Sequence, residues 1–320
     1  MPSPAHRFLS LTLQLKRWKM APSLTYKQAT DTQSHPKWTV TLKDIPSWHC
    51  DNVYILTGYR RPQDWRGCVH SIYAYLHNET GNIHTHLWPG VLSLYFMVTV
   101  NPSQLTSGRT TWVDSAVFSI FFASAAFSLL SSAAWHTATA HQSPEVCSRC
   151  NALDYVGIII LNAGSSCSSL YYGFFCESET LSLYSSIVLL LNAAAAFVII
   201  DPEYAKPTHI ALRTTIFIGL GAFSVIPVFH WLIVHGPATT LTAMGVKWFI
   251  LSGSAYIGGA LLYANRIPEC FHPGTYDYLF NSHQILHVCV AMAVYFHYKF
   301  MSIALDYSHT QSRCTQPVFL

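Results

Sequence analysis

Long stretches without a charged side chain dominate the chain after residue 79. A membrane-spanning helix requires about 20 consecutive, mostly apolar residues, and seven windows free of Asp, Glu, Lys and Arg are long enough to hold one each. The pattern therefore predicts an all-α fold, a seven-transmembrane helical bundle in a membrane domain of residues 79–301. The predicted spans lie near residues 83–101, 115–136, 153–175, 182–200, 212–234, 246–264 and 280–301.

Composition supports a membrane environment. The chain is 51% hydrophobic and only 10% charged, whereas about a quarter of the residues in a soluble domain are charged. We therefore expect an integral, multi-pass membrane protein of the endoplasmic reticulum or plasma membrane, surrounded by the lipid bilayer. The net charge of +3 is small. Because the sequence contains no phosphate loop or nucleic-acid motif, no nucleic-acid partner is expected.

Lys and Arg are distributed unevenly along the chain. Residues 1–78 are polar and basic and hold 10 of the 18 Lys and Arg residues. Basic residues concentrate on the cytoplasmic side of membrane proteins, so this N-terminal segment is predicted to be cytoplasmic. An odd number of spans then places residues 302–320, a short C-terminal tail, on the exterior or lumenal side. The cytoplasmic loops add four more basic residues: Arg149, Lys206, Arg213 and Arg266.

Two short motifs are assigned no function. An apolar helical spacing in the N-terminal segment would suit either a helix in the membrane interface or a disordered tail; it is formed by Phe8, Leu11, Leu15 and Trp18. Cys147 and Cys150 have the spacing of half a zinc ribbon. Because no second pair lies at a matching distance, a structural role for these cysteines is favoured.

Four polar residues at helix ends point to a metal site. His283 and His287 lie four residues apart at the start of the seventh span, on one helical face, so both rings can reach one ion. His136 ends the second span and Asp154 opens the third. The predicted topology places all four on the cytoplasmic side at similar depth. Each histidine alone would more often be a helix-end residue with a hydrogen bond to backbone or headgroup, but the spacing and shared depth favour a metal ion.

Three imidazoles with an open fourth position are typical of catalytic zinc, and a nearby carboxylate can hold and deprotonate a metal-bound water. A further polar cluster opens the first span. Glu79, Asn82 and His86 fall on one helical face at three- and four-residue spacing. We expect these residues to cap helices and support the ligands by hydrogen bonds. Direct ligation by them is the less favoured alternative.

At these residues the sequence resembles the progestin and adipoQ receptor (PAQR) family, most closely its fungal Izh-like, adiponectin-receptor-like branch. The resemblance covers roughly residues 44–301. It implies seven helices, an intracellular N-terminus and a zinc ion bound by His136, His283 and His287, with Asp154 acting through a water. The matching motifs are Ile45-Pro46-Ser47-Trp48, Tyr54 through Arg60, Asn78-Glu79-Thr80 with Asn82 and Thr85-His86-Leu87, Ser132 through His136, Leu153-Asp154-Tyr155, Pro268-Glu269, Pro273-Gly274, Asp277 and residues 282–287.

The family is similar to haemolysin III and to a wider group of membrane hydrolases that includes alkaline ceramidases. This similarity implies a hydrolase of lipid amides, in which Asp154 accepts a proton from water and Ser132 orients the site or stabilises the oxyanion. The substrate would be a membrane lipid or another apolar small molecule, and the activity would serve lipid, sterol or zinc homeostasis.

Two alternatives stay open, because one fold serves many functions. The first is a ligand receptor without turnover. The second is a biosynthetic enzyme of secondary metabolism, of the terpenoid cyclase or isomerase type. His84 stands where an aromatic or apolar residue is common in the family, and this departure leaves room for the biosynthetic alternative.

Overall fold

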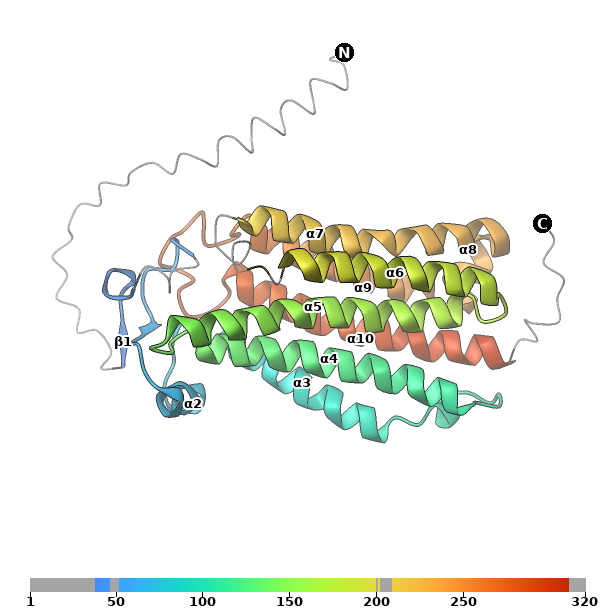
Figure 1. The fold of residues 1–320 in the computed structure, drawn as a ribbon, viewed down its shortest axis with the longest axis horizontal. Coiled ribbons are helices and arrows are strands. Elements are labelled where there is room, and N and C mark those ends of the chain that lie inside the picture. The colour runs from blue at the N-terminus through green and yellow to red at the C-terminus, as the bar shows by residue number, and fades with distance from the viewer. Residues whose placement is uncertain (1–37, 47–51, 200, 202–208, 311–320) are drawn as a thin grey trace, which may run out of the picture. The chain divides into compact units, whose positions relative to one another are not determined.

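The computed structural model of this chain describes residues 38–46, 52–199, 201 and 209–310 (Figure 1). Residues 8–18, with the apolar spacing noted above, lie outside the described residues. The regular secondary structure of the described part is helical apart from a two-stranded ribbon of β1 (Thr39–Val40) and β2 (Tyr59–Arg60), so the predicted all-α class is confirmed. The strands pair antiparallel, with Thr39 opposite Arg60 and Val40 opposite Tyr59.

Each of the seven predicted spans coincides with a helical segment, and the fifth is formed by two consecutive helices. Among the described residues, four segments are long and apolar enough to cross a membrane: Trp112–Ala138, Ser178–Ile199, Ala211–Ala243 and Ser282–Thr310. The helices are α3 (Thr80–Thr99), α4 (Trp112–Ala138), α5 (Pro144–Gly173), α6 (Ser178–Ile199), α7 (Ile210–Phe223), α8 (Val225–Ala238), α9 (Val246–Ala264) and α10 (Ser282–Thr310). Shorter elements are η1 (Leu42–Asp44), α2 (Trp65–Ala74), η3 (Pro102–Gln104) and η5 (Thr239–Ala243).

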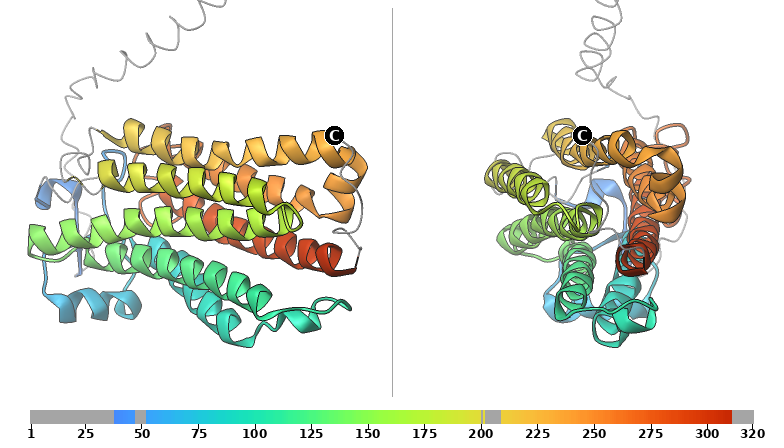
Figure 2. Two further views of the ribbon diagram at one scale, coloured as in Figure 1. Left: turned by 45° about the vertical axis from the view of Figure 1, so that its right-hand side comes forward. Right: turned by 90° about the vertical axis from the view of Figure 1, so that its right-hand side faces the viewer.

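The long helices lie side by side (Figures 1 and 2). α4 packs against α3 and α5, and α10 packs against α9 and α3. Glycines allow the close approach of α5 to α4: a Cβ atom on Gly157 would lie 2.9 Å from Cα of Ser128, and one on Gly164 would lie 2.1 Å from Oγ of Ser124. Small residues permit such contacts between helices that lack a strong hydrophobic driving force in lipid. This packing fixes the start of α5 beside the end of α4.

Two buried carboxylates hold the segment before α10, and one of them contacts the first residue of that helix. Glu269 is fully buried and accepts hydrogen bonds from the backbone N–H of Ser282 (2.7 Å) and from Nδ2 of Asn52 (3.0 Å). Asp277 accepts from the backbone N–H groups of Leu56 (3.0 Å) and Thr57 (2.8 Å). A carboxylate at a helix N-terminus is favoured by the helix dipole. These contacts tie the segment before the membrane domain to the first turn of α10.

The last helix is longer than the predicted seventh span. α10 continues to Thr310, past Lys299, where the charge-free window ends. A single lysine does not end a helix, because its long side chain can carry the ammonium group toward water while the backbone stays helical. The first residues assigned by sequence to the C-terminal tail are therefore helical, and where the membrane boundary falls on α10 stays a prediction.

Candidate metal centre

Three histidines meet at one end of the bundle. His136 lies in the last turn of α4, and His283 and His287 lie in the first two turns of α10. One possible ligand atom from each lies within 4.8 Å of the others, and this is the only such group of three among the described residues. The ring centroid of His136 is 4.7 Å from that of His283 and 4.8 Å from that of His287. The fold therefore brings together the three residues that the sequence predicted as ligands.

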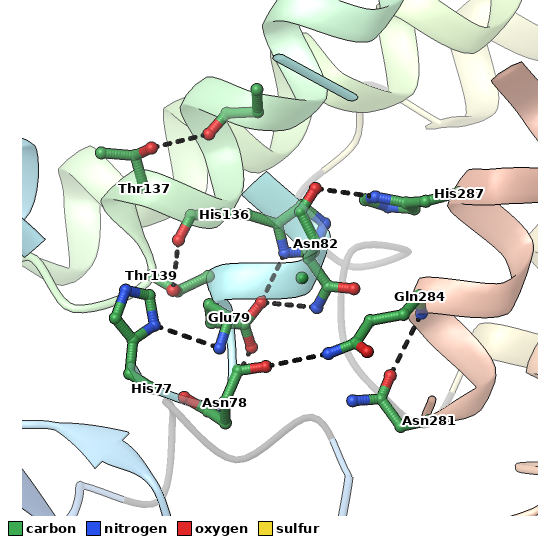
Figure 3. A network of polar contacts seen from close by, with 12 residues as sticks. His77, Asn78, Glu79, Asn82, His136, Thr137, Thr139, Asn281, Gln284 and His287 are labelled. Atoms are coloured by element: carbon green, nitrogen blue, oxygen red, sulfur yellow. Dashed lines mark hydrogen bonds and ion pairs between the residues drawn. The ribbon is translucent and has the colours of Figure 1, made fainter. Parts of the chain in front are cut away.

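Hydrogen bonds fix the direction of two of these rings. Nδ1 of His136 lies 2.7 Å from Oε2 of Glu79, and Nδ1 of His287 lies 3.0 Å from the backbone oxygen of Asn82 (Figure 3). Because a carboxylate and a carbonyl oxygen only accept, each Nδ1 carries a proton, and in the neutral ring each Nε2 then has the lone pair that a metal ion requires. Nε2 of His136 is buried and has no hydrogen-bond partner in the described part of the chain. A metal ion would supply that partner.

Glu79 is itself held in place from the start of α3. Nδ2 of Asn82 donates to Oε2 of Glu79 at 2.7 Å. Burial acts to raise the pKa of Glu79, but the hydrogen bond and charge attraction of His136 outweigh it and hold that pKa well below its usual range. An ionised carboxylate on Nδ1 makes the opposite ring nitrogen a better ligand. Glu79 and Asn82 thus contact two of the three histidines, as expected for residues that support ligands.

His77 positions the backbone of Glu79. Its Nδ1 accepts from the backbone N–H of Glu79 at 3.1 Å, and its Nε2 lies 3.2 Å from the backbone oxygen of Ser71. Burial, with a smaller contribution from the nearby Arg60 charge, lowers the pKa of His77 to about 3. The ring is therefore neutral at physiological pH, which agrees with one accepting and one donating nitrogen.

Arg60 supports the site, a role that no sequence pattern indicated. Its guanidinium is buried and donates to the backbone oxygens of His136 (2.6 Å) and Thr137 (3.2 Å). It also donates to Oγ of Ser71 (2.8 Å) and Oγ1 of Thr139 (2.7 Å). The last carbonyls of a helix lack partners within the helix. Arg60 donates to these carbonyls at the end of α4 and so fixes the turn that carries His136.

Asp154 and Ser132 lie beside the three histidines without joining them. Ser132 is one turn before His136 on α4 and is buried. Asp154 lies near enough to Ser132 and His136 for their polar groups to interact. Asp154 is absent from the group of possible ligand atoms. This placement is compatible with action through a water, and the roles of both residues stay predictions.

His86 has an unusual environment. Its ring stacks on that of His287, with centroids 3.6 Å apart and planes 2° from parallel. The residue is 5% exposed, and neither ring nitrogen has a hydrogen-bond partner among the described residues. A buried polar group without a partner costs about 1–3 kcal/mol. The nitrogens of His86 therefore mark a position where water or a bound ligand would be stabilised next to the histidine cluster.

The donor set fits a zinc ion. Neutral imidazole nitrogens are common zinc ligands, and three protein ligands leave a position for water or substrate. Cys147 and Cys150 do not supply an alternative site, because neither belongs to a group of three possible ligand atoms among the described residues, and Sγ of Cys147 donates to the backbone oxygen of Ala138 at 3.1 Å.

Comparisons with known proteins identify a family and relatives of this chain. The profile of a family described as "Haemolysin-III related" matches residues 74–298. The chain is 36% identical to the adiponectin receptor protein of Drosophila melanogaster, over 86% of this chain and 62% of the fly protein. It is 32% identical to the ADIPOR-like receptor IZH2 of Saccharomyces cerevisiae, over 88% of this chain and 92% of the yeast protein. It is 31% identical to progestin and adipoQ receptor family member 3 of Homo sapiens, over 85% of this chain and 87% of the human protein. The matched part thus spans less than two thirds of the fly receptor.

Proposed function

Because the chain belongs to the haemolysin-III-related family of PAQR and adiponectin-receptor-like proteins, and is a multi-pass integral membrane protein, we propose that it is a zinc-dependent hydrolase of lipid amides. The single observation that carries the proposal is the buried cluster of His136, His283 and His287, in which Nε2 of His136 has no hydrogen-bond partner from the described ranges of the chain. Substrates of the ceramide class would link the activity to lipid, sterol or zinc homeostasis.

In this proposal the protein crosses the membrane seven times, with its N-terminus in the cytoplasm. Support comes from the coincidence of seven predicted spans with helical segments and from the concentration of basic residues before residue 79. Reporters fused before Met1 and after Leu320 are expected on opposite sides of the membrane. Finding both reporters on one side would contradict an odd number of spans.

In the proposed reaction, water adds to the amide carbonyl carbon and the carbon–nitrogen bond breaks, which gives a carboxylic acid and an amine. A bound zinc ion supplies Lewis-acid activation of water and carbonyl oxygen. Asp154 accepts the proton of the attacking water and returns it to the leaving nitrogen. Ser132, which lies beside Asp154, orients that carboxylate. Glu79 and Asn82 accept from Nδ1 of His136 and His287 and so direct the Nε2 atoms of these two rings toward the metal position.

A receptor without turnover is the second candidate, and it is favoured by the fly and yeast relatives, which are both named as receptors. Both candidates use the same buried site. They differ in whether a proton acceptor beside the metal is needed, which makes Asp154 the residue that separates them.

Asp154→Asn tests the hydrolase directly. We expect zinc to be retained, because the three histidines remain, and turnover of a ceramide to fall by about a hundred- to ten-thousandfold, since an amide cannot accept the proton. Ser132→Ala should reduce turnover less, because it removes one supporting hydrogen bond. The measurement pairs zinc content with activity on two substrates. A ceramide tests the hydrolase, and a prenylated epoxide tests the terpenoid cyclase alternative. Full activity of Asp154→Asn would exclude Asp154 as the general base. A wild-type protein that is inactive on both substrates would favour the receptor function.

A further inference from the structure

α2 (Trp65–Ala74) differs in direction from the long helices. Figure 1 shows α2 nearly end-on, whereas the bundle helices run across the view, and Figure 2 shows the same helix from the side. Its inner face holds Cys68 and Ser71, both fully buried, and it packs against α4. A helix that crosses the direction of membrane-spanning helices lies roughly parallel to the bilayer plane.

The outer half of α2 carries two adjoining strips of different character. One is apolar and exposed: Trp65, Val69, Tyr73 and, just past the helix, Leu76. The other is formed by Arg66 and His70, which are also exposed, and exposed Arg61 lies just before the helix. Residues three and four apart share a helical face, so each strip is continuous. A helix with one apolar and one basic side is suited to the boundary between headgroups and acyl chains.

Charge indicates which headgroups fit. Residues 1–78 contain ten Lys and Arg residues but four acidic residues, all aspartates. The aspartate nearest the helix, Asp64, caps it by accepting from the backbone N–H of Gly67 at 2.9 Å. Basic residues at a membrane surface are attracted to acidic lipids, by about 1 kcal/mol each. Tryptophan and tyrosine are enriched at the same depth, which agrees with Trp65 and Tyr73.

We propose that α2 is an interfacial helix that binds lipids with acidic headgroups, at the bundle end that carries the histidine cluster. Trp65, Val69 and Tyr73 enter the acyl boundary. Arg61 and Arg66 contact the headgroups. Because Arg60 bonds both Ser71 of α2 and the backbone oxygen of His136, the lipid-bound helix is tied to the turn that carries one predicted ligand. The proposal requires the membrane location of the chain but no catalytic activity.

Tryptophan quenching by brominated lipids tests the proposal. The full chain is placed in nanodiscs of phosphatidylcholine and phosphatidylserine, with bromine on the acyl chains of one lipid at a time. The signal of Trp65 is the difference between wild type and Trp65→Phe. We expect Trp65 to be quenched, and more strongly when the serine lipid carries the bromine. In Arg61→Gln/Arg66→Gln this preference should fall by about fivefold or more, as loss of two charges near the surface implies.

Trp112, exposed at the opposite end of α4, provides the matched control: the Trp112→Phe difference should show no preference for the serine lipid. Circular dichroism and zinc content of each variant check folding independently of turnover. Absence of quenching at Trp65 from either lipid would overturn the interfacial location. Equal quenching by both lipids, unchanged in the arginine variant, would overturn the selectivity for acidic headgroups.

Discussion

Two pairs of histidine and carboxylate lie at opposite ends of α4, and they differ in one respect. Near the end of α4, Nδ1 of His136 lies 2.7 Å from Oε2 of Glu79; near its start, Oδ1 of Asp114 lies 3.0 Å from Nε2 of His309. Both pairs join distant segments, and all four residues would count as functional candidates inside a membrane. Residue type alone does not distinguish them.

The Asp114–His309 pair is closed, in the sense that its carboxylate is surrounded by further hydrogen-bond donors. Its carboxylate also accepts from the backbone N–H (2.7 Å) and Oγ1 (3.0 Å) of Thr111 and from the hydroxyl of Tyr172 (3.2 Å). These contacts tie the start of α4 to α5 and α10. Fully connected polar networks specify a buried arrangement, so we interpret this pair as structural.

The Glu79–His136 pair is open, in the sense that one of its buried polar atoms lacks a hydrogen-bond partner among the described residues. Its histidine has a second nitrogen, Nε2, that is buried without a hydrogen-bond partner among the described residues, and two further imidazoles face it. The neighbouring His86 ring lacks partners within the same described ranges. Unsatisfied atoms, more than residue types, therefore separate a site that binds from a cluster that stabilises.

The largest effect on stability is expected at the closed pair. Asp114→Ala should lower the free energy of unfolding by about 3–5 kcal/mol, because it removes the carboxylate that joins Thr111, Tyr172 and His309 in a buried network. Zinc content should not change. Denaturation in detergent measures the first quantity and elemental analysis the second. Asp306→Ala is the matched control, since Asp306 is an exposed carboxylate on α10; an equal effect of both substitutions would show that the buried network is not stabilising.

A smaller effect is expected at the open pair. Glu79→Gln keeps the shape of the side chain but removes the charge that holds the Nδ1 proton of His136, so zinc affinity should fall by about ten- to a hundredfold. Competition with a chelator of known affinity measures it. Glu177→Gln is the control, because Glu177 also lies near a histidine, 3.8 Å from Nε2 of His235. Unchanged affinity in Glu79→Gln would mean that the carboxylate does not support the ligand.

Much of the fold follows from the charge-free windows, because the cost of placing charge in lipid restricts where charged residues occur. The pairing of His283 with His287 follows from helical spacing alone. Arg60 could not be identified this way: its importance depends on its contacts with the end of α4, which the sequence does not encode as a local pattern. The Asp114–His309 pair was missed for the same reason, and because His309 lies beyond the last charge-free window.

Spacing also could not indicate which ring nitrogens are free. That depends on Glu79 and on the backbone oxygen of Asn82, which reach His136 and His287 across the bundle. Helical periodicity placed Glu79 and Asn82 on one face of α3. It did not show that Asn82 would contact Glu79 by its side chain and His287 by its backbone.

The most direct test is the zinc content of purified histidine variants. Wild type should carry about one zinc per chain, and His136→Ala, His283→Ala and His287→Ala should each lose most of it, because each removes one of three protein ligands. His309→Ala should retain zinc even if it is less stable, since its pair is closed. Zinc loss confined to the three cluster variants would support the metal centre. Equal loss in His309→Ala with folding intact, or a wild type without zinc after zinc-supplemented expression, would contradict it.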